Sequence, residues 1–70
     1  MKDYNYSVLK GKIKEKYDTQ SNFAKALGMS EGTLTSRLNN TSCFTQEDIR
    51  KCIELLGIDY SEIGKYFFTH

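Results

Sequence analysis

Apolar residues recur every three or four positions along most of this chain, and that spacing most limits the fold it can adopt. A period near 3.6 places apolar side chains on one face of a helix, whereas a half-buried strand requires strict alternation. No alternating stretch is long enough for a strand, and the sequence contains neither an internal repeat nor a low-complexity segment. The spacing therefore predicts an all-α protein, a compact bundle of about five short helices.

Local signals divide the first part of this pattern into two helices. One is expected over about residues 7–17. The next starts at about Gln20, behind a cap at Thr19 or Asp18, and ends at Gly28. Glycine suits the left-handed backbone that commonly ends a helix. The expected buried faces of these two helices consist of Leu9, Ile13, Tyr17, Phe23, Ala24 and Leu27.

A third helix is expected behind Ser30, which can cap it. It runs through Leu34 and Leu38, which share its apolar face, to the pair Asn39 and Asn40. Asparagine tolerates the left-handed conformation, so this pair suits the end of a helix.

Two more helices complete the predicted fold. Thr45 is followed three positions later by Asp48, the pattern of a capping box, so a helix is expected to begin there and to stop at Gly57. A last short helix is expected over about residues 60–67. The apolar sides of these two helices consist of Ile49, Cys52, Ile53, Leu56, Ile58, Ile63, Tyr66 and Phe67.

A chain of 70 residues is expected to form one domain over residues 1–70, too small for the deep pocket of a typical enzyme. The only histidine is His70, and there is no glycine-rich phosphate loop and no set of ligands at metal-binding spacing. We therefore expect no catalysis, no cofactor, no metal and no small-molecule ligand. Cys43 and Cys52 lack the close spacing of zinc ligands and are interpreted as reduced thiols, with Cys52 in the core.

No apolar run is long enough to cross a membrane, and the N-terminus lacks the apolar core of a secretory signal, so a cytoplasmic protein is expected. The formal net charge is only +1, which does not by itself indicate nucleic-acid binding. Residues 1–44, however, contain seven basic and four acidic residues, whereas residues 45–70 contain three basic and five acidic residues. The basic part is the expected source of phosphate contacts, and ordinary solubility explains the same split.

Residues 19–40 carry the functional signal. A short helix, a turn at Gly28 and a second helix with a polar outer face follow one another there, which is the order of a helix-turn-helix. Ala24 is small where the two helices would cross, and Leu34 and Leu38 would anchor the second helix to the core. Periodicity alone favours DNA binding and a plain helical bundle equally.

The run TQSNFAKALGMSEGTLTSRLNN resembles the helix-turn-helix of phage Cro and repressor proteins and of the related XRE-like bacterial regulators. The positions typical of that family are Gln20, Ala24, Gly28, Leu34 and Asn39. The tail LLGIDYSEIGKYFF resembles short phage or prophage regulators of poorly defined function. The resemblance implies a lambda-repressor-like domain in the cytoplasm of a bacterial host. It also implies sequence-specific binding of double-stranded DNA as a transcriptional regulator, with the helix of about residues 30–38 in the major groove.

The resemblance also implies roles for individual residues. The candidates for reading base edges are Glu31, Gly32, Thr33, Thr35, Ser36 and Arg37. The candidates for phosphate contacts are Gln20, Ser30, Asn39, Asn40, Thr41 and Ser42. Capping and loop solvation explain the second set equally well, and a favourable charge at a helix N-terminus explains Glu31. Two positions depart from the family: Gly32 offers no side chain for readout, and Asn40 stands where glycine is common.

Regulators of this kind usually bind two half-sites as dimers, so a homodimer on DNA is implied. The candidate dimer surface is the C-terminal cluster of Tyr60, Tyr66, Phe67 and Phe68, for which completion of the core is the alternative. The implied action is repression by occlusion of a promoter, with activation left open. The rival function is a protein-interaction module on a helix-turn-helix scaffold that has lost DNA binding, and the near-neutral charge agrees with it.

Overall fold

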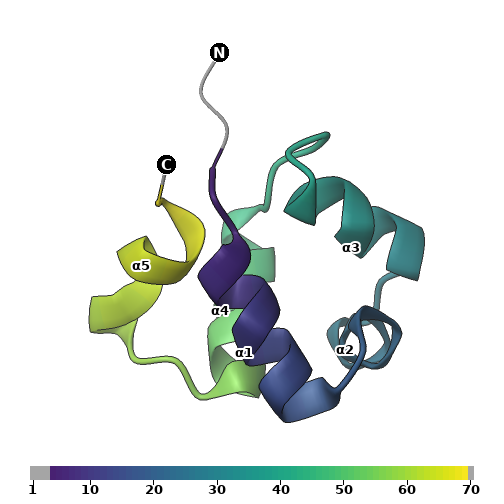
Figure 1. Cartoon of the computed structure of the whole chain (residues 1–70), viewed down its shortest axis with the longest axis horizontal. Coiled ribbons are helices and arrows are strands. Elements are labelled where there is room, and N and C mark those ends of the chain that lie inside the picture. Colours follow the sequence, from purple (N-terminus) through teal and green to yellow (C-terminus); the bar gives the residue numbers. More distant parts are fainter. Residues whose placement is uncertain (1–3, 70) are drawn as a thin grey trace.

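The computed structural model describes residues 4–69 and contains only helices and connecting segments within them, which confirms the predicted all-α class (Figure 1). Each helix expected from the sequence is present. The elements are α1 (Ser7–Tyr17), α2 (Gln20–Leu27), α3 (Glu31–Leu38), α4 (Gln46–Leu56), the 3-10 turn η1 (Tyr60–Glu62) and α5 (Ile63–Phe67).

Side chains cap three of the helices at their N-termini, because the first backbone N–H groups of a helix have no partner within it. The Oγ1 of Thr19 accepts a hydrogen bond from the N–H of Asn22 at 3.1 Å, which identifies Thr19, and not Asp18, as the cap of α2. Ser30 caps α3 in the same way. The capping box of Thr45 and Asp48 at the start of α4 is formed as predicted.

Three residues have the left-handed conformation at the helix ends where it was expected. Gly28 follows α2 with φ 78°, and Gly57 follows α4 with φ 67°. Asn40 has φ 63°, as predicted from the tolerance of asparagine for this conformation. Asp18 also has a positive φ, of 71°, at the end of α1, where a left-handed aspartate was not predicted.

The C-terminal helix is divided where the sequence predicted one continuous helix. The Oδ1 of Asp59 accepts from the N–H of Ser61, and its carbonyl accepts from the N–H of Glu62. These local bonds hold residues 60–62 in a tighter 3-10 turn before α5 begins at Ile63.

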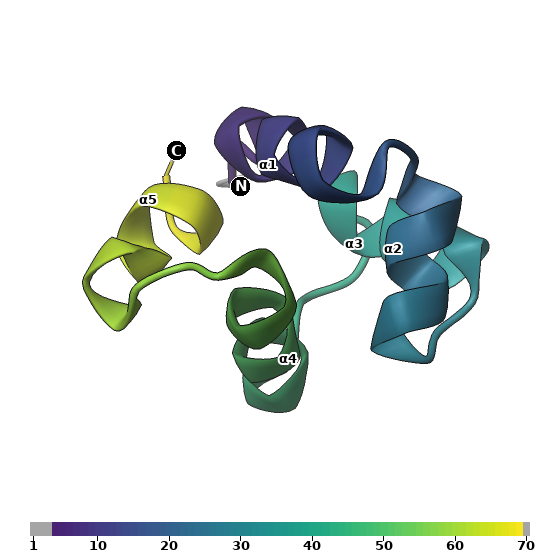
Figure 2. The same cartoon turned by 90° about the horizontal axis from the view of Figure 1, so that it is seen from below.

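Helices α1 and α4 form the centre of the molecule, with α2 and α3 on one side and α5 on the other (Figures 1 and 2). Helix α1 packs against α2, α4 and α5, and α2 also packs against α3 and α4. Their shared core is formed by Leu9, Ile13, Phe23, Ala24, Leu27, Leu34, Leu38, Cys52, Ile53, Leu56, Ile58, Tyr66 and Phe67. Within residues 4–69, none of the helices has the length and apolar character needed to span a membrane.

Tyr6 is a core residue that the helical pattern did not reveal, because it precedes α1. Its ring meets Phe44 edge to face at a centroid distance of 5.4 Å, and Phe44 meets Phe67 in the same manner at 5.3 Å. Such edge contacts are a preferred geometry of aromatic pairs. The N-terminal segment, the loop before α4 and the C-terminal helix are therefore joined through three rings.

Candidate functional site

Helices α2 and α3 form a helix-turn-helix arrangement around Gly28. In Figure 1, α2 is seen nearly along its axis while α3 lies across the view, so the two helices cross. The N–H groups of Gly28 and Met29 close the end of α2 on the carbonyls of Lys25 and Ala24, at 3.1 and 3.0 Å. Ala24 is buried, and α2 packs on α3. The turn predicted from the sequence is present, with Ser30 leading directly into α3.

The outer face of α3 offers few side chains for reading DNA bases. Of its predicted base-reading residues, Glu31 and Gly32 are exposed, while the others are partly buried. The Oγ1 of Thr33 lies 2.8 Å from the Oγ of Ser30 within the helix cap. The Oγ1 of Thr35 donates to the Oε1 of Gln20 at 3.4 Å. The most accessible positions of α3 are thus a carboxylate and a glycine.

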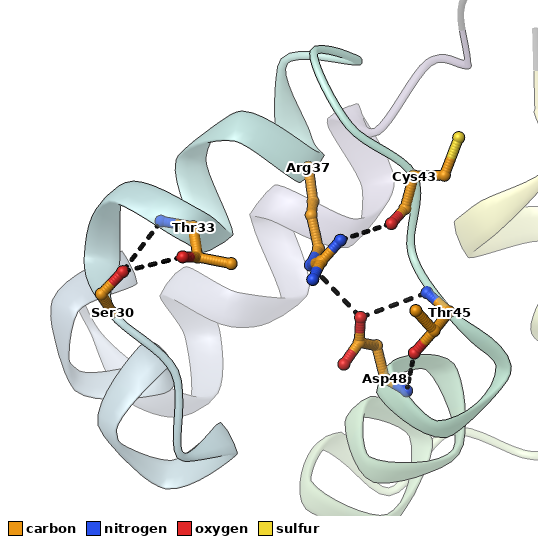
Figure 3. A network of polar contacts seen from close by, with 6 residues as sticks. All are labelled: Ser30, Thr33, Arg37, Cys43, Thr45 and Asp48. Carbon is orange, nitrogen blue, oxygen red and sulfur yellow. Dashed lines mark hydrogen bonds and ion pairs between the residues drawn. The ribbon is translucent and has the colours of Figure 1, made fainter.

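The side chain of Arg37, predicted as a base or phosphate contact, is only 20% exposed and lies against the segment that leads into α4. Its Nη1 donates to the carbonyl of Cys43, and its Nε lies 3.2 Å from Oδ2 of Asp48 (Figure 3). Nε is shielded from solvent and meets the carboxylate as an ion pair without the alignment of a hydrogen bond. The guanidinium links α3 to the start of α4, because it lies between two acceptors, the carbonyl of Cys43 and the carboxylate of Asp48.

Asn40, predicted as a phosphate contact, uses its side-chain amide for hydrogen bonds within the molecule. Its side chain accepts from the N–H of Tyr4 at 3.0 Å and donates to the carbonyl of Tyr4 at 2.9 Å. The N–H groups of Thr41 and Ser42 donate to the carbonyl of Ser36, so this loop closes the end of α3. The side chains of Asn39, Thr41 and Ser42 are exposed, and their predicted phosphate contacts stay predictions.

The predicted dimer cluster is split by the fold. Tyr66 and Phe67 are only 7% and 1% exposed, which corrects their assignment to a surface: α5 turns both rings into the core. Tyr60 and Phe68 are 70% and 50% exposed. They line a largely apolar groove of about 570 Å³ between α4 and the C-terminal segment, together with Ile49, Ile53, Ile63, Gln46, Glu47 and Arg50.

Positive charge is scarce on the helix-turn-helix. Residues 19–42 contain only two cations, Lys25 on α2 and the enclosed Arg37. The lysines expected to attract phosphate lie on α1, where Lys12 pairs with Glu15 at 3.6 Å. Within residues 4–69, no three His, Cys, Asp or Glu side chains are grouped as a metal site requires.

Sequence reasoning did not identify Asp48 as a partner of Arg37. The sequence signal at Asp48 was the capping box with Thr45, and the structure forms it. The second contact of the same carboxylate, across to α3, depends on how the two helices approach one another. No spacing in the sequence encodes that approach.

Comparison with known proteins places the chain in a family. The model of the family described as "Protein of unknown function (DUF739)" matches residues 2–70. A search of curated proteins gives no match. One similar solved structure is the solution structure of the modulator of repression (MOR) of the temperate bacteriophage TP901-1 from Lactococcus lactis. That protein is 45% identical, the alignment covers 93% of this chain and 88% of that one, and the TM-score is 0.83.

These matches confirm part of the resemblance inferred from the sequence. The similar structure is a phage regulatory protein, as the C-terminal tail predicted. The matched family is DUF739, however, and membership of the Cro and repressor family is not established by it. Since the match covers nearly the whole sequence, this chain belongs to the DUF739 family.

Proposed function

We propose that this protein is a phage or prophage regulator that modulates repression by binding a repressor protein, and that it does not itself act as a DNA-binding repressor. The observation that carries this proposal is the similarity along 93% of the chain to a phage modulator of repression, at 45% identity. The site of action would be the cytoplasm of the bacterial host.

The charge on the helix-turn-helix supports a protein partner. Binding to duplex DNA relies on Lys and Arg side chains that neutralise phosphates. Here Arg37 is paired with Asp48, and the exposed end of α3 carries the carboxylate of Glu31, which repels phosphate. Lys25 is left as the exposed cation of residues 19–42. One exposed lysine on the helix-turn-helix is a weak basis for binding DNA through this motif.

The C-terminal groove also supports a protein partner. Protein interfaces are enriched in aromatic residues and arginine and depleted of other charged residues at their centre. Exposed Tyr60 and Phe68 line the groove beside Ile63, with Arg50 at its side. Exposed apolar surface of this kind is typical of interaction sites.

Direct DNA binding is the second candidate, because the crossed α2 and α3 and the capped start of α3 have the geometry of a DNA-reading motif. In that case the protein would bind as a homodimer on two half-sites and repress by occlusion. The exposed Tyr60 and Phe68 would then remain the candidate dimer contacts.

A titration distinguishes the two candidates. The repressor encoded by the same phage or prophage is bound to labelled operator DNA, and fluorescence anisotropy follows its affinity as this protein is added. We expect the affinity of the repressor for its operator to change. This protein alone should bind random-sequence duplex more weakly than about 10⁻⁴ M at physiological salt, the loose end of non-specific binding.

Two substitutions sharpen the titration. Tyr60→Ser removes an exposed ring of the groove and should weaken the effect on the repressor. Lys25→Ala removes the exposed cation of the helix-turn-helix and should leave that effect unchanged. An unaffected repressor, together with enrichment of a two-fold symmetric DNA site by this protein alone, would contradict the proposal and favour direct DNA binding.

A further inference from the structure

Arg37 is held on two sides near the end of α3. Its side chain is 20% exposed and that of Asp48 is 15% exposed, so both charges are largely removed from solvent. Figure 3 shows the guanidinium reaching from α3 to the first turn of α4, between the carbonyl of Cys43 and the carboxylate of Asp48. An ion pair shielded in this way is less screened by salt than one on an open surface.

Asp48 is itself fixed in place independently of Arg37. Its Oδ2 accepts from the N–H of Thr45 at 3.1 Å, and its own N–H donates to the Oγ1 of Thr45 at 3.0 Å. This reciprocal pair is the capping box of α4, so the helix start holds the carboxylate where Arg37 meets it. The acceptor is therefore preorganised, and Arg37 docks onto a rigid site.

A bound phosphate would have to compete with this site for the guanidinium. Arginine is suited to phosphate because its planar fork donates several hydrogen bonds at once. In this protein one nitrogen of that fork is already bound to a carbonyl and another faces a carboxylate. Moving Arg37 to DNA would also leave a partly buried carboxylate without its cation, which is unfavourable.

We infer that Asp48 is a specificity-determining residue that keeps this helix-turn-helix from binding DNA, by holding the guanidinium of Arg37 away from the phosphate backbone. This inference rests on the proposed function, since it explains how a helix-turn-helix scaffold is reserved for a protein partner. Neutralising Asp48 releases Arg37 and creates non-specific affinity for duplex DNA. Asp48 thus favours a protein partner over duplex DNA.

The test compares Asp48→Asn with Glu47→Gln. Both remove one negative charge at neighbouring positions, but Glu47 is exposed and pairs with Lys51 at 3.8 Å, away from Arg37. The amide introduced by Asp48→Asn keeps an oxygen that can accept from the N–H of Thr45, and the backbone N–H of residue 48 can still donate to Thr45, so both bonds of the capping box can form. The two variants therefore separate the release of Arg37 from the change in net charge.

Binding is measured by fluorescence anisotropy with a labelled random-sequence duplex at low and at physiological salt, and by the salt needed to elute each variant from heparin. Asp48→Asn should bind about tenfold more tightly than Glu47→Gln, as expected for one added charged contact. The slope of its log affinity against log salt should steepen by the amount expected for about one added phosphate contact. Adding Arg37→Gln should abolish the gain.

Equal behaviour of Asp48→Asn and Glu47→Gln, including no measurable binding by either, would overturn the inference. A gain that survives Arg37→Gln would overturn it too. Circular dichroism verifies that each variant is folded, and Asp48→Ser replaces Asp48→Asn if the latter melts below the assay temperature. These outcomes leave the proposed function standing, because that function is tested separately by the effect of the unmodified protein on the repressor.

Discussion

The side-chain amide of Asn40 forms two hydrogen bonds with the backbone of Tyr4, 36 residues earlier in the chain. The N–H of Tyr4 donates to Oδ1 at 3.0 Å, and Nδ2 donates to the carbonyl of Tyr4 at 2.9 Å. The backbone of Asn40 is left-handed, with φ 63°. The end of α3 and the segment before α1 are joined by this one side chain.

Replacing Asn40 with glycine should destabilise the protein by about 1–3 kcal/mol, the net value of two hydrogen bonds. Glycine adopts the left-handed conformation readily, so Asn40→Gly removes the hydrogen bonds without straining the backbone. Asn40→Ala should cost roughly 1–2 kcal/mol more, because alanine is strained there. The measurement is the free energy of unfolding in urea.

Asn39→Ala is the control for this comparison, since Asn39 is exposed and its φ of −96° suits any residue. It should change the free energy of unfolding by no more than about 0.5 kcal/mol. A stability of Asn40→Gly equal to that of the unmodified protein would show that the link to Tyr4 contributes nothing.

Phe67 and Phe68 form a matched pair for testing which C-terminal rings belong to the core. Phe67 is 1% exposed and Phe68 50% exposed. Phe67→Ala should therefore cost about 3–5 kcal/mol of stability, including the cavity that it leaves. Phe68→Ala should cost about 0.5–1.5 kcal/mol, mainly through its edge contact with Tyr4, whose centroid lies 5.7 Å away. Similar losses in thermal or urea unfolding would contradict the assignment of Phe67 to the core.

Cys52 makes stability depend on pH in the alkaline range. Burial, with a smaller contribution from the charge of Asp48, raises the pKa of its thiol from 9.0 to about 12. The folded protein keeps this proton while the unfolded chain releases it. Stability is therefore fully present below pH 9 and is lost as pH rises toward 12, by at most about 1.4 kcal/mol per pH unit.

Comparing the pH dependence of unfolding in Cys52→Ala with that of the unmodified protein isolates this effect, because the other titrating groups are shared. The alanine variant should show a shallower decline above pH 9. Thiol labelling offers a second measurement: exposed Cys43 should react in the folded protein, and buried Cys52 only after unfolding. Equal slopes for the two proteins would contradict the shift at Cys52.

The helices, their caps and their left-handed ends could be predicted because each depends on residues a few positions apart. Thr45 and Asp48 are separated by three residues, so their reciprocal bonds are encoded by local spacing. Gly28 ends α2 for the same kind of reason, since the left-handed conformation is a property of the residue itself. Periodicity likewise predicted most of the buried residues on α1, α2 and α4.

The surroundings of the predicted site residues could be predicted less well, because they depend on which segments meet in space. Arg37 has the chemistry of a DNA contact, but the fold places its guanidinium between the carbonyl of Cys43 and the carboxylate of Asp48. Tyr66, Phe67 and Phe68 are adjacent aromatic residues of one cluster, and the packing of α5 decides that two are buried and one is exposed.

The amino-acid sequence by itself determined that this protein is helical, where its first four helices begin and end, and that α2 and α3 are joined by a tight turn. Those features follow from short-range backbone preferences and capping bonds. Only the tertiary structure decided that Asn40 binds Tyr4 and that Arg37 is paired with Asp48. Both contacts join segments brought together by burial of the shared core, and that burial depends on the whole chain at once.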